Sequence, residues 1–314
     1  MNIKLPLITV IMPIYNSQRT LEESIKSILQ QSFKNFELIL IDDASNDNSK
    51  TIIKKYANLD SRIIPIYSKQ NLGVGSTLNK GLKTAKGKYI AIQDSDDYSH
   101  KNRLEEEYNY LEKYKKIFLV GSSINKVDLN RNLLYKTHRI NLPSFLIKLY
   151  LLFTKSLLAH STVMFRNEKK YFYKPNIRSA IDYYFYLNLM YHNKKFKNIS
   201  KILVDYTYNH NGISMQKSFE QKIEEIHARN YYILKKIFNK KIDFKLEDAY
   251  FEKLKQKYSR LELKLKIRNY YRLENIQKGN KCLKLYIYQY KRIPIKYLIL
   301  SILSIFNKNI IKRA

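Results

Sequence analysis

Three carboxylates fall within four positions of the chain, at Asp94, Asp96 and Asp97. They directly follow residues 89–92, which are mostly β-branched or aromatic and come after Gly87, so this run predicts a buried strand. Like charges crowded at a strand end cost free energy unless a cation or hydrogen-bond donors offset them. Oxygen ligands suit Mg²⁺ or Mn²⁺, which complete their shells with water and substrate phosphates. The pattern therefore predicts a metal–diphosphate site, with a solvated acidic turn as the alternative.

Strand-like and helix-like segments alternate through the first hundred residues. Buried strands are predicted at residues 7–15, 36–41, 63–67 and 89–92, with helices between them. The run T-L-E-E at residues 20–23 matches a capping box. This alternation predicts an α/β fold with a doubly wound, mostly parallel sheet flanked by helices. Ligands bind such a sheet beyond the carboxyl ends of its strands, where the three acids fall. If the chain stays extended there, Asp94 and Asp96 point to one face and Asp97 to the other.

The remainder of the chain divides into two regions. Further strands are predicted at residues 118–123, 133–138, 160–165 and 202–208, and helices at 101–114 and 180–191. Beyond these the sequence is helical and heavily charged, so we expect one domain at 1–215 and a helical C-terminal region at 216–314. In that region, residues 297–306 are apolar between basic neighbours and far shorter than the ~20 residues that span a bilayer. They predict either a helix lying in the membrane interface or one packed on protein.

Bulk composition narrows the class of protein. The chain has 314 residues, a hydrophobic content of 45% that supports a core, and a net charge of +31. Because the lysines are spread along the chain without a nucleic-acid-binding signature, the charge is weak evidence for a polyanionic partner. One cysteine, Cys282, excludes an internal disulfide framework and indicates a reducing compartment. No G-x-G-x-x-G or Walker A sequence is present, so dinucleotide and P-loop chemistry lack support.

Several ordered motifs together resemble a known family. They are T-V-I-M-P-I-Y-N at residues 9–16, E-L-I-L-I-D-D-A-S-N-D at 37–47, N-L-G at 71–73, N-x-G at 79–81, A-x-G at 85–87 and D-S-D-D at 94–97. Their order and spacing resemble glycosyltransferase family two, of the GT-A fold, over residues 5–215. The resemblance implies inverting transfer of a sugar from a nucleotide-sugar, usually UDP-linked, to an acceptor hydroxyl, with Mn²⁺ or Mg²⁺ as cofactor.

The resemblance assigns roles to individual residues. Those implied to contact the nucleotide-sugar are Pro13, Tyr15, Asn16, Asp43, Asn71, Gly73, Asp94 and Asp97. Within this set, Asp43 is implied to bind the base and Asp94 to lie near the ribose or donor sugar, while Asp96 is implied to ligate the metal. These residue types suit the roles, because a carboxylate can accept from a uracil N–H and Tyr15 offers a stacking face. Taken alone, Asp43 would be read as a helix cap and Tyr15 as packing.

The acceptor side is implied by three later motifs. Residues 158–166 resemble the family's strand before the acceptor site, and residues 179–182 align with its Glu-Asp pair, in which Ile181 replaces the usual Glu. The resemblance makes Asp182 the catalytic base. Residues 206–214 resemble the closing segment, in which His210 reaches the metal or diphosphate. A lone loop histidine is equally often structural, so both readings of His210 stay open.

These observations favour a glycosyltransferase that acts on a growing cell-surface glycan, free or lipid-linked, in the cytoplasm or at the inner face of the membrane. The C-terminal tail would supply a peripheral membrane contact, and no nucleic-acid partner is expected. One alternative is a nucleotidyltransferase, although its Gly-rich and Lys signature near the N-terminus is absent. The other is a basic nucleic-acid or membrane-surface binding protein, which would show salt-dependent RNA binding without turnover of a nucleotide-sugar.

Overall fold

The computed structural model describes residues 5–138, 141–153, 156–175, 177 and 180–208, together with the single positions 225, 228 and 232. All of them belong to one unit, Met1–Asn239. The expected domain boundary near residue 215 and the apolar tail at residues 297–306 lie outside the described residues. Within the described part, no helix has the length and apolar character needed to cross a membrane.

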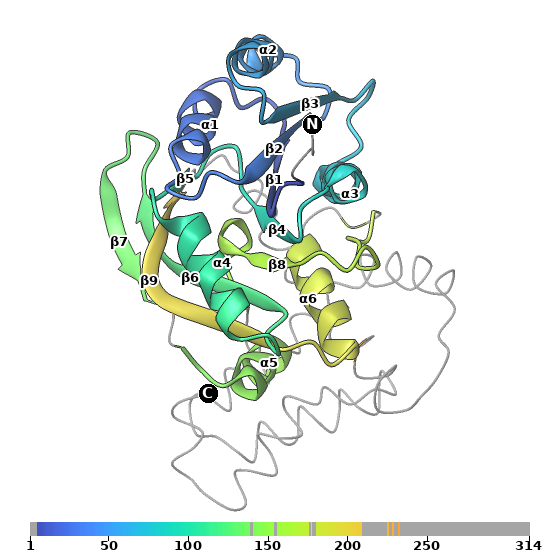
Figure 1. Ribbon diagram of the computed structural model, residues 1–314, viewed down its shortest axis with the longest axis vertical. Helices are drawn as coiled ribbons and strands as arrows, with labels where there is room; N and C mark the ends of the chain where they lie inside the picture. Colours follow the sequence, from blue (N-terminus) through green and yellow to red (C-terminus); the bar gives the residue numbers. More distant parts are fainter. Residues whose placement is uncertain are drawn as a thin grey trace, which may run out of the picture. The chain divides into compact units, whose positions relative to one another are not determined.

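Four parallel strands form one half of the sheet (Figure 1). In spatial order they are β3 (Ile63–Tyr67), β2 (Phe36–Asp42), β1 (Ile8–Ile14) and β4 (Tyr89–Ile92). Every residue of β2 and β4 is buried, which is typical of parallel strands covered on both faces. The sequence prediction of four β–α units is confirmed for this half.

The direction of the strands changes beyond β4. Next in spatial order come β8 (Met164–Arg166), β6 (Leu119–Val127), β9 (Phe196–Thr207) and β5 (Tyr98–Ser99), while β7 (Leu133–Thr137) pairs with β6. In this half only β6 and β9 run parallel to each other. The sheet as a whole is therefore mixed. The strand predicted at residues 160–165 is wrong in its first part, because His160–Thr162 forms a 3₁₀ turn and the strand begins at Met164.

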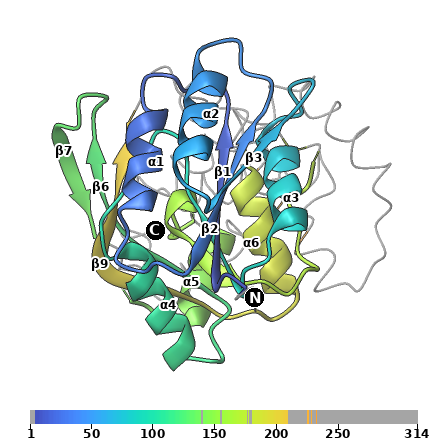
Figure 2. The ribbon, with the colours of Figure 1, turned by 45° about the horizontal axis from the view of Figure 1, so that its top comes forward.

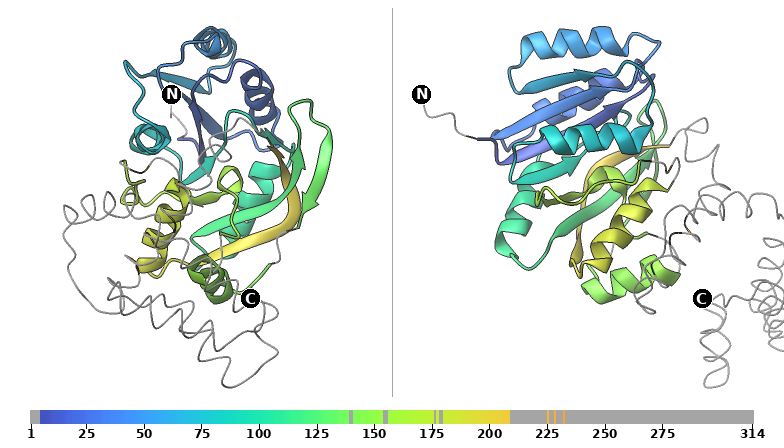
Figure 3. Two further views of the ribbon diagram at one scale, coloured as in Figure 1. Left: turned by 180° about the vertical axis from the view of Figure 1, so that it is seen from behind. Right: turned by 90° about the vertical axis from the view of Figure 1, so that its right-hand side faces the viewer.

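Helices cover both faces of the sheet (Figures 2 and 3). One core cluster contains side chains of α1 (Leu21–Leu29), α2 (Ser49–Leu59) and α4 (Arg103–Lys113), and the other contains side chains of α3 (Val74–Thr84), α5 (Ser144–Phe153) and α6 (Ile181–Tyr191). The helix α5 was not predicted. Since each helix in the first half connects two strands, the loops that precede α1, α2 and α3 gather at the carboxyl ends of β1, β2 and β3.

The predicted capping box at residues 20–23 is wrong. Thr20 is the N-cap residue of α1, but its side chain makes no capping hydrogen bond. Its hydroxyl instead donates to the backbone carbonyl of Ser95, at 3.1 Å. Ser24, one turn further along the helix, donates in the same way to the carbonyl of Asp94, at 2.9 Å. The first helix is thus tied to the acidic segment rather than capped by its own side chains.

Candidate active site

The acidic segment forms a tight turn directly after β4. The backbone N–H of Asp97 donates to the carbonyl of Asp94 at 3.3 Å, so the expectation of an extended chain is wrong. Asp94 and Asp96 are partly exposed, whereas Asp97 is fully buried. One carboxylate oxygen of Asp97 accepts from the backbone N–H of Thr207 at 2.8 Å, and this bond secures the end of β9. Asp97 thus supports the turn from within, and its contact with a nucleotide-sugar stays a prediction.

Burial and mutual repulsion dominate the electrostatics of the turn. Burial raises the pKa of Asp94 to about 6, and burial together with the charge of Asp94 raises the pKa of Asp96 to about 7. Burial, together with the charges of Asp96 and Asp94, raises the pKa of Asp97 well above its ordinary value, and its Oδ2 atom is buried without a hydrogen-bond partner. A cation beside these carboxylates would offset their repulsion and favour the ionised forms.

The residues present fit a metal that takes few protein ligands. Among the described residues, no group of three or more His, Cys, Asp or Glu side chains could hold a metal. The partly exposed carboxylates of Asp94 and Asp96 match the one or two that Mg²⁺ typically takes when substrate phosphates complete its shell. His210, the other predicted ligand, lies outside the described residues.

A network of buried polar side chains, which includes Gln93 and Arg103, supports the acidic turn. Gln93 donates to the carbonyls of Asp94 and Asp97, at 3.1 and 2.9 Å, and so holds both ends of the turn. Arg103 donates to the side chain of Gln93 and to the carbonyl of Ile92, both at 2.8 Å. Its charge is balanced by Glu107 at 3.1 Å, and a buried charge requires such a partner. Because the supporting groups are locked by packing, the turn is preorganised.

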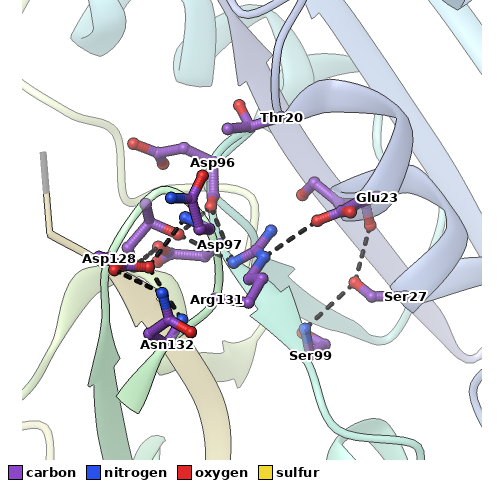
Figure 4. A network of polar contacts seen from close by, with 12 residues as sticks. Thr20, Glu23, Ser27, Asp96, Asp97, Ser99, Asp128, Arg131 and Asn132 are labelled. Carbon is purple, nitrogen blue, oxygen red and sulfur yellow. Dashed lines mark hydrogen bonds and ion pairs between the residues drawn. The ribbon is translucent and has the colours of Figure 1, made fainter. Parts of the chain in front are cut away.

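The β6–β7 hairpin also contacts and supports the acidic turn (Figure 4). Arg131 lies at the tip of the β6–β7 hairpin and donates to the backbone carbonyl of Asp96 at 3.3 Å and to the hydroxyl of Thr207 at 2.9 Å. It also forms an ion pair with Glu23 of α1 at 3.0 Å. The backbone of Arg131 has a positive φ of 66°, which is uncommon for a residue with a side chain. Asp128 holds this tip by accepting three hydrogen bonds from Asn130 and Asn132.

The residues predicted at the end of β1 gather at the carboxyl edge of the sheet. Pro13 lies in β1, and Tyr15 just beyond the strand is 45% exposed, so its ring is available for stacking. Asn16 adopts a positive φ of 50°. Its side chain accepts from the backbone N–H of Asn46 at 2.9 Å, and its own N–H donates to Ser45 at 3.0 Å. Asn16 therefore joins the loops after β1 and β2.

Asp43 holds the loop before α3. Its two carboxylate oxygens accept from the backbone N–H groups of Leu72 and Gly73, at 3.0 and 2.8 Å. Asn71 also accepts from the N–H of Gly73, at 3.1 Å, and Gly73 has a positive φ of 81° that favours glycine. The structure brings Asp43, Asn71 and Gly73 together through hydrogen bonds that sequence reasoning did not foresee. The proposed contact of Asp43 with a base stays a prediction.

Asp182 lies in the first turn of α6, near His160 and Asp94. Burial raises the pKa of Asp182, and the nearby His160 partly offsets this. His160 lies with its Nδ1 atom 4.0 Å from Oδ1 of Asp94, and its own pKa is lowered by burial. Asp94, His160 and Asp182 therefore form one electrostatically coupled group. Ile181, where the family pattern has Glu, is buried in the core.

Two of the site residues were not predicted from the sequence. His160 lies in an apolar run that was read as a strand, and a single histidine there carries no functional signal. Arg131 lies within an Asx-type turn sequence, D-L-N-R-N at residues 128–132. This sequence predicts a hairpin but not the contact between the hairpin tip and Asp96. Both contacts join segments far apart in the sequence, so only the folded chain reveals them.

Comparison with known proteins gives consistent results. The sequence model described as glycosyl transferase family 2 matches residues 9–201. The glycosyltransferase MJ1057 of Methanocaldococcus jannaschii is 33% identical over 255 residues, which cover 79% of this chain and 85% of that protein. TuaG of Bacillus subtilis, named as a glycosyltransferase of teichuronic acid biosynthesis, is 38% identical over 106 residues, covering 34% of this chain and 42% of TuaG. The structure of residues 1–349 of TarS from S. aureus with UDP-GlcNAc superimposes with a TM-score of 0.62 at 20% identity, covering 89% of this chain and 80% of that one.

Proposed function

Because the chain belongs to glycosyltransferase family 2 and has the GT-A fold, we propose that it transfers a sugar from a UDP-linked donor, with inversion, to a hydroxyl of a growing cell-surface glycan. The observation that carries this proposal is the turn of Asp94 and Asp96 directly after β4, with the partly exposed Asp182 near Asp94 and with Asp43 holding the loop before α3. The UDP-GlcNAc bound to TarS supports the choice of donor, and the named pathway of TuaG supports the class of acceptor.

In the proposed reaction, Asp182 accepts the proton of the acceptor hydroxyl while the oxygen of that hydroxyl attacks the anomeric carbon of the donor sugar. The new carbon–oxygen bond forms on the face opposite the departing diphosphate, and UDP leaves with the electrons of the broken bond. Burial raises the pKa of Asp182, which brings a carboxylate base closer to the range useful for proton transfer. Asp96, with Asp94 beside it, would hold Mn²⁺ or Mg²⁺, and the metal would neutralise charge on the diphosphate.

The proposed function also includes the cellular compartment in which the enzyme acts. A single cysteine in 314 residues suits a reducing compartment, so we place the enzyme in the cytoplasm. A lipid-linked acceptor would bring it to the inner face of the membrane.

A panel of nucleotide-sugars tests the proposed function. The full chain is incubated with UDP-, GDP- and dTDP-sugars in the presence of Mn²⁺, Mg²⁺ or EDTA, and nucleotide release and thermal shift are recorded. We expect a UDP-sugar to raise the melting temperature and to be consumed in the metal-containing arms only. If no nucleotide-sugar binds or is consumed in any arm, the proposal fails. If only a GDP- or dTDP-sugar is used, the assignment of UDP is wrong.

Replacing Asp43 tests the nucleotide side of the site. Asp43→Ala removes two charge-assisted hydrogen bonds to the Leu72–Gly73 backbone and the proposed contact with the base. Hydrogen bonds to charged groups contribute about 1.5–3 kcal/mol, so we expect UDP affinity to fall at least about 10-fold with or without metal. Isothermal titration with UDP measures this change. Thr77→Ala is the matched control, because it removes a hydrogen bond to the carbonyl of Gly73 in the same loop and leaves Asp43 in place. Equal losses in both variants would assign Asp43 to the loop alone.

A further inference from the structure

His160 and Tyr173 form a largely buried polar pair next to Asp94 of the acidic turn. The Nε2 atom of His160 lies 3.0 Å from the hydroxyl of Tyr173, and the two rings meet edge to face at 5.6 Å. The side chain of His160 is 13% exposed, and Tyr173 is 2% exposed. Neither residue is used in the reaction described above.

The protonation of this pair follows from its surroundings. Both side chains are largely shielded from water, which favours their neutral forms. One arrangement has the phenol donating to Nε2, which leaves the ring proton on Nδ1, facing the Asp94 carboxylate at 4.0 Å. The reverse arrangement turns the Nδ1 lone pair toward that carboxylate and is repelled. The first arrangement is therefore favoured.

We propose that His160 is a positioning residue for Asp94, and that Tyr173 fixes the ring proton with which His160 does so. The inference rests on the proposed function, in which Asp94 contacts the donor sugar. A neutral Nδ1–H at 4.0 Å from the carboxylate favours one orientation of Asp94 electrostatically, without adding a competing charge beside the proposed metal site. The arrangement resembles the way in which outer partners fix the tautomer of metal-bound histidines.

Tyr173 is itself held by α3, the helix that follows the loop containing Gly73. Asn79 of α3 accepts from the backbone N–H of Tyr173 and donates to its carbonyl, both at 2.8 Å. A Cβ atom at Gly75 of the same helix would lie 3.2 Å from the carbonyl of Lys174, so this close approach favours glycine. The ring of Tyr173 stacks on Phe185 of α6 at 4.3 Å. One tyrosine thus joins the helix after the Gly73 loop to the helix that carries Asp182.

Two replacements of His160 separate its two contacts. His160→Asn keeps a nitrogen at the Nδ1 position and loses the contact with Tyr173, whereas His160→Gln keeps a group near Nε2 and loses the donor to Asp94. Tyr173→Phe removes a single hydroxyl and keeps the stacking on Phe185. Donor turnover with the nucleotide-sugar found active in the panel, and UDP affinity, are measured for each variant.

We expect His160→Gln and Tyr173→Phe to lower kcat about 10- to 100-fold, as is typical when a group that orients a functional side chain is removed. His160→Asn should retain clearly more activity than His160→Gln, and UDP affinity should change less than about 2-fold in all three variants. Tyr171→Phe, on the same segment but packed against Phe118, is the matched control and should leave kcat unchanged. If Tyr173→Phe keeps the full kcat, the proposal is overturned.

The tautomer provides a readout that does not depend on activity. In ¹⁵N-histidine NMR of the full chain, the His160 signals are identified by their absence in His160→Asn. We expect the neutral Nδ1–H form in the wild type and a shift toward mixed tautomers in Tyr173→Phe. An Nε2–H form in the wild type would overturn the proposal. Failure of the nucleotide-sugar panel would instead reject the proposed function and leave this measurement interpretable.

Discussion

Asp96→Asn is expected to abolish metal-dependent donor binding and to reduce turnover at least about 100-fold, while the protein stays folded. The amide keeps the size of the side chain and loses the charge that would hold the cation. The fold should survive because Asp96 secures the turn through its backbone carbonyl, which accepts from Arg131 and Thr207 and is unchanged in the variant. Mn²⁺ titration followed by the thermal shift with UDP measures the loss.

The control for this prediction separates metal binding from a general loss of negative charge. Asp60→Asn removes a carboxylate that forms a surface ion pair with Arg62, remote from the acidic turn, and should behave as wild type. UDP binding in EDTA should be the same in both variants, because the proposed base contact does not involve the metal. An Asp96→Asn protein with full turnover would contradict the assignment of Asp96.

The parallel half of the fold could be predicted because its signals are local. Predominantly apolar runs of five to seven residues define β1, β2 and β3, and neighbouring parallel strands must place their carboxyl ends together. For that reason the loops carrying Asp43 and Asn71, which follow β2 and β3, lie at the same edge of the sheet. The second half mixes strand directions, its strands range from two residues in β5 to twelve in β9, and its register depends on partners far away in the sequence.

The sequence predictions were wrong or incomplete at residues whose side chains contact segments far away in the sequence. Thr20 fits the local capping pattern, but its hydroxyl bonds to a carbonyl 75 residues later. Arg103 begins a charged helix and would be expected at the surface, yet it is fully buried because Glu107 and Gln93 satisfy it. Arg131 and His160 gain their roles from contacts across the sheet. Pattern reasoning treats each segment separately, so it cannot identify residues whose function is to support another segment.

Asp182→Asn is expected to separate donor binding from sugar transfer. The variant should bind UDP and metal as the wild type does, because Asp43 and Asp96 are untouched. Transfer to the acceptor should fall about 10²- to 10⁴-fold, the usual contribution of a positioned proton acceptor. This pattern, in which kcat falls while donor affinity is kept, identifies a group that acts in the transition state. The measurement requires an acceptor, since slow hydrolysis of the donor does not involve the same proton.

A structural role for Asp182 predicts a different result. The N-cap of α6 is Ala180, and Asp182 lies inside the first turn, where its carboxylate interacts with the helix dipole and with the backbone N–H of Tyr183. The interaction with the dipole contributes about 0.3–1 kcal/mol, so Asp182→Asn should unfold at nearly the wild-type denaturant concentration. A large loss of stability with a proportionate loss of activity would make Asp182 structural. Conversely, a stable variant that transfers sugar at the wild-type rate would show that another group accepts the proton.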